Sequence, residues 1–231
     1  MGLPLPKKLA AECLGTFCLV FAGTGAIVIN DISGGAVTHV GIALTFGLIV
    51  FAMIAAVGEV SGAHLNPAVT FGFFLARRFP GHSVAPYVAS QFAGAVLASI
   101  TVRVLFPSHP TLGGTLPAGS IFQSLILEAL LTATLMFVIL SVTTGAKEKG
   151  VTAGIAVGGV IALEALFAGP VSGASMNPAR SLAPALVSWQ LGAVWVYLTG
   201  PTLGASLAVP ACRYIREPGC CRAVPVEEAR L

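Results

Sequence analysis

Two short segments place an asparagine, a proline and an alanine in the same order. Gly62–Thr70 reads GAHLNPAVT and Gly173–Ser181 reads GASMNPARS. Each follows a long apolar run and precedes only two or three helical turns of apolar residues, too few to cross a bilayer. The proline suits the first position of a helix, where its missing N–H would have no partner. Each segment therefore predicts a half-helix that begins just after an asparagine. The residues of the two motifs are Asn66, Pro67, Ala68, Asn177, Pro178 and Ala179.

Two such half-helices entering a membrane from opposite faces would meet at their N-termini near its centre. Each N-terminus carries roughly half a positive charge, and the Asn66 and Asn177 amides offer N–H donors. A water held by both amides points its oxygen at them, which interrupts the chain that a hopping proton needs. Arg180 adds a permanent charge and further donors. This arrangement favours neutral, hydrogen-bonding solutes and repels cations, including protons.

The composition predicts that the elements carrying these motifs lie in a membrane. Of 231 residues, 56% are apolar and 9% are charged, outside the range of soluble domains. Continuous apolar runs of spanning length indicate helices rather than barrel strands. The expected class is an all-α membrane protein with six transmembrane helices and two re-entrant half-helices. The six spans are Leu9–Ile29, Val37–Val57, Ser83–Phe106, Ile121–Val142, Val151–Ala168 and Leu191–Val209.

The chain also repeats itself. The run AECLGTFCLVF from Ala11 aligns with LEALLTATLMF from Leu127, which matches Glu12 to Glu128, and the motif VSGA occurs at Val60 and Val171. Each half has three spans, so the second must enter the membrane with opposite polarity, as an inverted 3+3 repeat. We expect one channel domain over residues 1–231, with repeats at 9–106 and 121–209 and a cytoplasmic tail at 214–231.

The distribution of basic residues predicts the orientation. Most lysines and arginines flank the spans on the side shared by the termini, whereas residues 30–36 and 107–120 contain none. The termini of this multi-pass protein are therefore expected in the cytoplasm, and the protein in a plasma or inner membrane. The formal net charge of +3 reflects this asymmetry and implies no nucleic-acid partner.

The paired motifs within an inverted repeat resemble the aquaporin, or major intrinsic protein, family over about Leu9–Val209. The pattern AGPVSGASMNPARS is most similar to the bacterial nodulin-like or aquaglyceroporin-related members. The resemblance implies a homotetramer with one pore per subunit and passage of water, glycerol and neutral metalloid hydroxides. It also implies an outer constriction, or selectivity filter, of four residues. In strict water channels these four positions resemble the set Phe, His, a small residue and Arg. This chain has Phe46, Ala165, Ala174 and Arg180 at the matching positions, which predicts a wider neck.

Other polar residues have more than one interpretation. Glu12 and Glu128 are expected to brace the re-entrant loops, although membrane carboxylates also relay protons. Glu59 and Glu164 receive only a default loop-bracing interpretation, and Cys220 and Cys221 could accept acyl chains. His64 is interpreted as a loop-packing residue, the histidines His39, His82 and His109 form no ligand cluster, and Phe71, Phe73 and Phe74 suggest ordinary lipid- or core-facing surface.

The leading hypothesis is a passive channel for water and small uncharged solutes in the lipid bilayer. The alternatives are a strictly water-selective channel, a proton-coupled carrier using Glu12, Glu128 and Glu164, and a scaffold with a vestigial pore. No nucleophile with a base, metal-ligand spacing or phosphate-binding loop is found. We therefore expect no enzyme activity, no cofactor and no metal.

Overall fold

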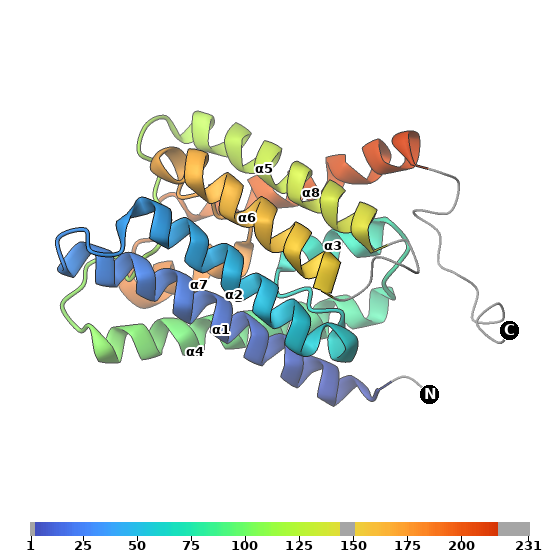
Figure 1. Cartoon of the computed structure of the whole chain (residues 1–231), viewed down its shortest axis with the longest axis horizontal. Coiled ribbons are helices and arrows are strands. Elements are labelled where there is room, and N and C mark those ends of the chain that lie inside the picture. The colour runs from blue at the N-terminus through green and yellow to red at the C-terminus, as the bar shows by residue number, and fades with distance from the viewer. Residues whose placement is uncertain (1–2, 144–150, 217–231) are drawn as a thin grey trace, which may run out of the picture.

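The computed structural model describes residues 3–143 and 151–216, which form an all-helical bundle (Figure 1). The long helices are α1 (Leu5–Ile32), α2 (Thr38–Ser61), α4 (Val84–Leu105), α5 (Ile121–Val142), α6 (Val151–Ser172) and α8 (Val194–Ile215). Two short helices, α3 (Pro67–Leu75) and α7 (Pro178–Ser188), follow the two Asn-Pro motifs, and a single 3-10 turn, η1 (Gly81–Ser83), precedes α4. The predicted all-α class with its two half-helices is confirmed.

Four of the six long helices extend beyond the apolar runs that predicted them, whereas α5 has the predicted bounds and α4 lies one residue inside them at each end. α1 begins at Leu5 and ends at Ile32, beyond both limits of the predicted span, and α8 starts later than expected but continues to Ile215. An apolar run marks only the part of a helix that faces hydrocarbon, whereas helical hydrogen bonding continues into the headgroup region of the membrane. Five of the long helices are apolar enough to count as spans by length and composition within the described residues. α8 is equally suited in length but includes several tyrosine, threonine and proline positions.

The helices are arranged as two interlocking halves. α1 packs on α4 and α2, and α5 packs in the same way on α8 and α6. Gly94 in α4 and Gly204 in α8 occupy equivalent repeat positions, and a Cβ at either would lie 2.1 or 2.2 Å from a backbone carbonyl oxygen, of Cys13 or Ala129. These two carbonyls are also repeat equivalents. The same close crossing, which small residues permit, is thus built once in each half.

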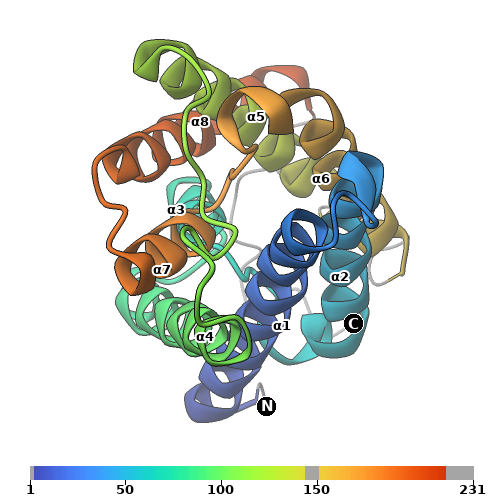
Figure 2. The same ribbon diagram turned by 90° about the vertical axis from the view of Figure 1, so that its left-hand side faces the viewer.

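The two half-helices enter the bundle from opposite ends. The first turn of α1 and the last turn of α8 lie at one end, on the right of Figure 1, which we call the terminal end. The α1–α2 turn and residues 106–120 lie at the other, the loop end. α3 lies in the half toward the terminal end and α7 in the half toward the loop end (Figure 1), and both lie between α4 and α8 (Figure 2). The inverted repeat thereby brings the N-termini of α3 and α7 together inside the bundle.

Candidate functional site: a conduit between two half-helices

The two asparagines tie the half-helices to each other. Nδ2 of Asn66 donates to the carbonyl oxygen of Met176 at 2.8 Å, and Nδ2 of Asn177 donates to that of Leu65 at 2.9 Å. Each acceptor lies directly before the other asparagine. Sequence reasoning did not anticipate this reciprocal exchange, because it joins residues more than a hundred positions apart.

The same amides also cap their own helices. Oδ1 of Asn66 accepts from the N–H of Ala68 at 2.9 Å, and Oδ1 of Asn177 accepts from the N–H groups of Ala179 at 3.0 Å and Arg180 at 3.3 Å. Asparagine is among the preferred residues for this position. Because each amide nitrogen has two hydrogens and gives one to the opposite loop, its second is available to a solute. The orientation of both amides is therefore fixed from two sides.

The loops leading to the asparagines have an unusual backbone. Ala63 and Leu65 in the first loop have φ values of 45° and 52°, and their repeat equivalents Ala174 and Met176 have 41° and 53°. This left-handed region is unfavourable for residues with a side chain, so surrounding contacts must hold it. Because these left-handed residues occur at every second position, successive carbonyl groups do not enter helical hydrogen bonds. They remain available along the loop.

Two buried carboxylates hold these loops. Glu12 accepts from the backbone N–H of His64 at 2.9 Å and of Leu65 at 2.7 Å, and Glu128 accepts from those of Ser175 and Met176, both at 2.8 Å. Each carboxylate also accepts from the serine that ends the preceding long helix, Ser61 or Ser172, and Glu12 accepts from Gln91 as well. Both glutamates are fully buried. A buried charge is tolerated when its oxygens are satisfied in this way.

A cavity of about 90 Å³ runs alongside the two asparagines. A single water needs roughly 10–15 Å³ measured in this way, so the space accommodates several. At the terminal end its walls include Thr143 and Ala153, and apolar side chains form most of the rest. The lining side chains near the half-helix ends and toward the loop end are Phe46, His64, Asn66, Phe73, Ala165, Ala174, Asn177 and Arg180.

All four residues predicted for the filter contribute to this cavity. The Phe46 ring lies against α1 at Gly23, where a Cβ would be only 2.1 Å from its Cε1 atom. Cζ of Arg180 lies 5.0 Å from the centroid of the same ring, within the range of a cation–π contact. With alanine at positions 165 and 174, the phenylalanine ring and the guanidinium are the bulky groups of the four. The assignment of these residues as a filter stays a prediction.

Arg180 is held by a loop that sequence reasoning had noted only for its lack of basic residues. Its Nη1 donates to the carbonyl oxygen of Gly113 at 3.0 Å, while Nε is buried without a hydrogen-bond partner among the described residues. Gly113 has φ of +68°, and a Cβ there would lie 2.6 Å from the carbonyl oxygen of Thr24. Only glycine suits both demands. The Gly113-Gly114 pair was a signal for a turn, but not for a contact with the arginine.

Two residues near the cavity do more than the sequence indicated. Phe73 is buried in the core, as the core-facing alternative predicted, and it also lines the cavity, with its ring 4.7 Å from that of His64. His64 packs as expected, also against Phe79 at 4.8 Å, but it lines the cavity too. The default bracing role is not supported by a hydrogen bond within the described residues for either Glu59 or Glu164. Glu59 is exposed, and Glu164 is buried with its Oε2 atom unpaired. Cys220 and Cys221 lie outside the described residues.

Apolar helices of spanning length around a polar path between two half-helix ends are the architecture of a membrane channel. The family model described as Major intrinsic protein matches residues 3–211, and the chain belongs to that family. The sequence-based prediction of this family is therefore confirmed.

Individual relatives agree with the family assignment. The chain is 49% identical over 216 residues to Aquaporin NIP1-1 of Oryza sativa subsp. japonica, covering 93% of this chain and 76% of the relative. It is 44% identical to Nodulin-26 of Glycine max, covering 89% and 76% of the two chains. The X-ray structure of the aquaglyceroporin from Plasmodium falciparum superposes with a TM-score of 0.83 at 26% identity, covering 92% of this chain and 97% of that one. The expected nodulin-like pattern is thus confirmed, with these curated relatives from plants rather than bacteria.

Proposed function

We propose that this chain forms a passive channel through which water and small uncharged solutes, glycerol among them, cross a membrane without protons or ions. One observation carries the proposal. Both half-helix asparagines and Arg180 line a single cavity, and among the described residues no carboxylate lines it. The family and the fold are those of channels and not of enzymes.

Proton exclusion follows from the geometry of the two amides. Each asparagine directs its oxygen to its own helix, so the cavity meets N–H groups at this level. A water accepting from both amides turns its hydrogens outward in both directions, and the partial positive charges of the two half-helix ends favour the same orientation. The apolar walls, such as Val50, Val69 and Val157, offer no alternative partners. A proton would have to hop against this orientation and past the Arg180 charge.

The small residues at the neck support the wider solute range. The other two predicted filter positions, Ala165 and Ala174, carry only methyl groups and line the same cavity as Phe46 and Arg180. A polyol can place its carbon face on the ring while its hydroxyl groups accept from Arg180. The structural similarity to an aquaglyceroporin points in the same direction. We extend the proposal to neutral metalloid hydroxides, which present hydroxyl groups of comparable size.

The contacts argue against a proton-coupled carrier. The carboxylate oxygens of Glu12 and Glu128 accept hydrogen bonds from the loop backbone, and neither residue lines the cavity. Glu164 does not line it either. A coupling carboxylate must meet the substrate path, and none of the three does. A scaffold role with a plugged pore finds no support in a cavity that passes both asparagines.

Assembly and orientation are part of the proposal. We infer a homotetramer from the family, which native mass spectrometry of the purified protein tests. We also place both termini in the cytoplasm of a cell whose plasma or inner membrane holds the protein, because Lys7, Lys8, Arg213 and Arg216 lie at the terminal end. A fluorescent fusion at either terminus should resist external protease on intact cells, and its digestion would reverse the orientation.

Reconstituted liposomes test the function directly. Purified protein should speed osmotic shrinkage and admit glycerol and arsenous acid down their gradients, with protein-free liposomes as the control. Uptake that saturates at low solute and requires a pH gradient would favour the carrier. Water flux without glycerol flux would favour a strictly water-selective channel and contradict the argument from Ala165.

A further inference from the structure

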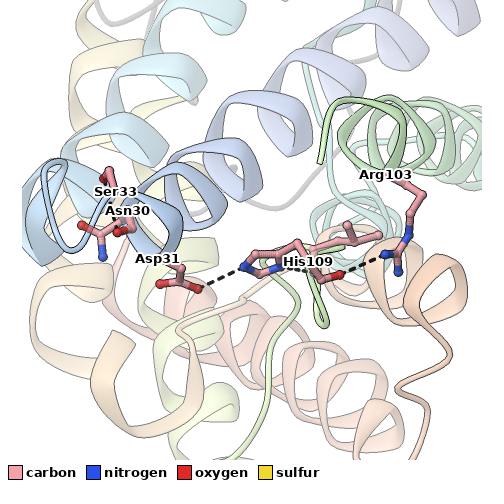
Figure 3. A network of polar contacts seen from close by, with 6 residues as sticks. Asn30, Asp31, Ser33, Arg103 and His109 are labelled. Carbon is pink, nitrogen blue, oxygen red and sulfur yellow. Dashed lines mark hydrogen bonds and ion pairs between the residues drawn. The ribbon is translucent and has the colours of Figure 1, made fainter. Parts of the chain in front are cut away.

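The segment that holds Arg180 is itself anchored by a histidine that the channel mechanism does not use. His109 lies at the loop end, where its Nε2 atom is 3.3 Å from Oδ2 of Asp31 in the last turn of α1 (Figure 3). Its Nδ1 atom faces the backbone N–H of Leu112 at 3.0 Å. A backbone N–H can only donate, so Nδ1 is the acceptor and the ring proton is on Nε2, directed at the carboxylate. The ring is nearly buried, with 8% of the residue exposed.

The hydrogen bond to Leu112 stabilises a turn with an unfavourable backbone. Leu112 has φ of 53° and Gly113 has 68°. A leucine in the left-handed region needs surroundings that hold it there. The Leu112 side chain is fully buried against Val28 and Val102, and its N–H is held by the imidazole. These two contacts fix the direction of the next carbonyl group, that of Gly113, which accepts from Arg180.

We propose that His109 is a positioning residue for the neck of the conduit. Its Nδ1 atom fixes the Leu112-Gly113 turn, and the Gly113 carbonyl in turn holds the Arg180 guanidinium in position over the Phe46 ring. The inference rests on the proposed channel function and adds to it a residue that sets the solute range from outside the cavity. His109 is absent from the cavity lining within the described residues.

Loss of the Nδ1 acceptor has a definite consequence at the neck. The Leu112 N–H is released, the left-handed turn relaxes, and the Gly113 carbonyl no longer faces Arg180. The guanidinium then has lost that acceptor, with the Phe46 ring 5.0 Å away and Glu128 and Tyr197 as its electrostatic neighbours. Its N–H donors lose their fixed position at the neck, where the hydroxyl groups of glycerol would accept from them. Glycerol permeability should therefore fall more than water permeability.

The charged groups that face this segment leave Nδ1 as the acceptor for Leu112. Asp31 from α1 faces Nε2. Arg103 from α4 donates through Nη1 to the carbonyls of Pro107 and His109, both at 2.9 Å, and a guanidinium has only donors. Arg103 therefore cannot replace Nδ1 as the acceptor for the Leu112 N–H.

Two amide substitutions separate the two ring nitrogens. His109→Asn places an amide oxygen near the position of Nδ1 and keeps the acceptor for Leu112. His109→Gln places its amide near Nε2, so it keeps the partner of Asp31 and loses that acceptor. Glycerol and water permeabilities are measured for both variants and the unchanged protein in liposomes at pH 7.5. Thermal unfolding in detergent is the control for folding.

The expected pattern is specific. At pH 7.5 the glycerol-to-water ratio of His109→Asn matches the unchanged protein, and that of His109→Gln is about two- to tenfold lower, the shift that one lost hydrogen bond of ordinary strength gives. Equal glycerol-to-water ratios in the two variants would overturn the proposal. If His109→Gln does not fold, His109→Ala, which also lacks the acceptor, takes its place in the comparison. Water flux no faster than bare lipid in the unchanged protein would instead refute the channel function.

Discussion

Gly23 in α1 makes room for the aromatic ring at the neck of the conduit. A Cβ at Gly23 would lie 2.1 Å from Cε1 and 2.4 Å from Cζ of Phe46. An ordinary contact begins at 3.4 Å, so Gly23→Ala must displace the ring by about 1.3 Å. Phe46 also lines the cavity. We therefore expect the ring to move into the path of the solute.

The displaced ring should affect glycerol more than water. A solute wider than water must push the ring back against the new methyl group. Overpacking of this kind typically costs about 1–3 kcal/mol, which corresponds to glycerol flux about 5- to 150-fold slower. Stopped-flow light scattering of liposomes gives the glycerol and water permeabilities from the same preparation.

Gly25→Ala is the matched control. Gly25 is in the same helix, and a Cβ there meets no atom within 4 Å. Both substitutions replace a helix-interior glycine and gain about 0.5–1 kcal/mol of helix stability, so helix propensity does not separate them. Gly25→Ala should keep the original glycerol-to-water ratio. If the two variants share one ratio, the Phe46 ring does not limit the neck and the reasoning is refuted.

Three further substitutions test other parts of the account. Ala165→His adds a bulky donor to the neck and should exclude glycerol while sparing water in the same assay; unchanged glycerol flux would remove Ala165 from the filter. Glu128→Gln replaces one accepting oxygen with an NH₂ group, so that a buried backbone N–H faces a second donor. This should lower the free energy of unfolding by about 1–3 kcal/mol, seen as a lower melting temperature in detergent. Gly204→Ala places a methyl group 2.2 Å from the Ala129 carbonyl oxygen, so it should abolish folded protein on size exclusion, whereas Gly159→Ala, with open space around its Cβ, should not.

Sequence reasoning predicted the features that depend on local pattern and on the repeat. Apolar runs indicated the long helices, and the position of Pro67 and Pro178 indicated where the half-helices begin. The pairing of Glu12 with Glu128 indicated equivalent places relative to the two loops. These features could be predicted because hydrophobic length, helix capping and repeat symmetry each leave a direct signal in the chain.

The features that were missed depend on backbone groups or on long-range contacts. The Asn66 and Asn177 amides donate to carbonyl groups, which every residue possesses and which therefore leave no sequence signal. The hydrogen bond from Arg180 to the Gly113 carbonyl was missed for the same reason. Phe73 resembled its neighbours in α3, and only the docking of the helix turned its ring toward His64.

The account depends on water passing the two amides while protons do not. Liposomes carrying the reconstituted channel and an enclosed pH-sensitive dye report both fluxes at once after an osmotic step combined with a pH step. The account predicts rapid shrinkage with the internal pH held at the rate of protein-free vesicles. Internal pH that follows the external pH as fast as the volume changes would contradict it.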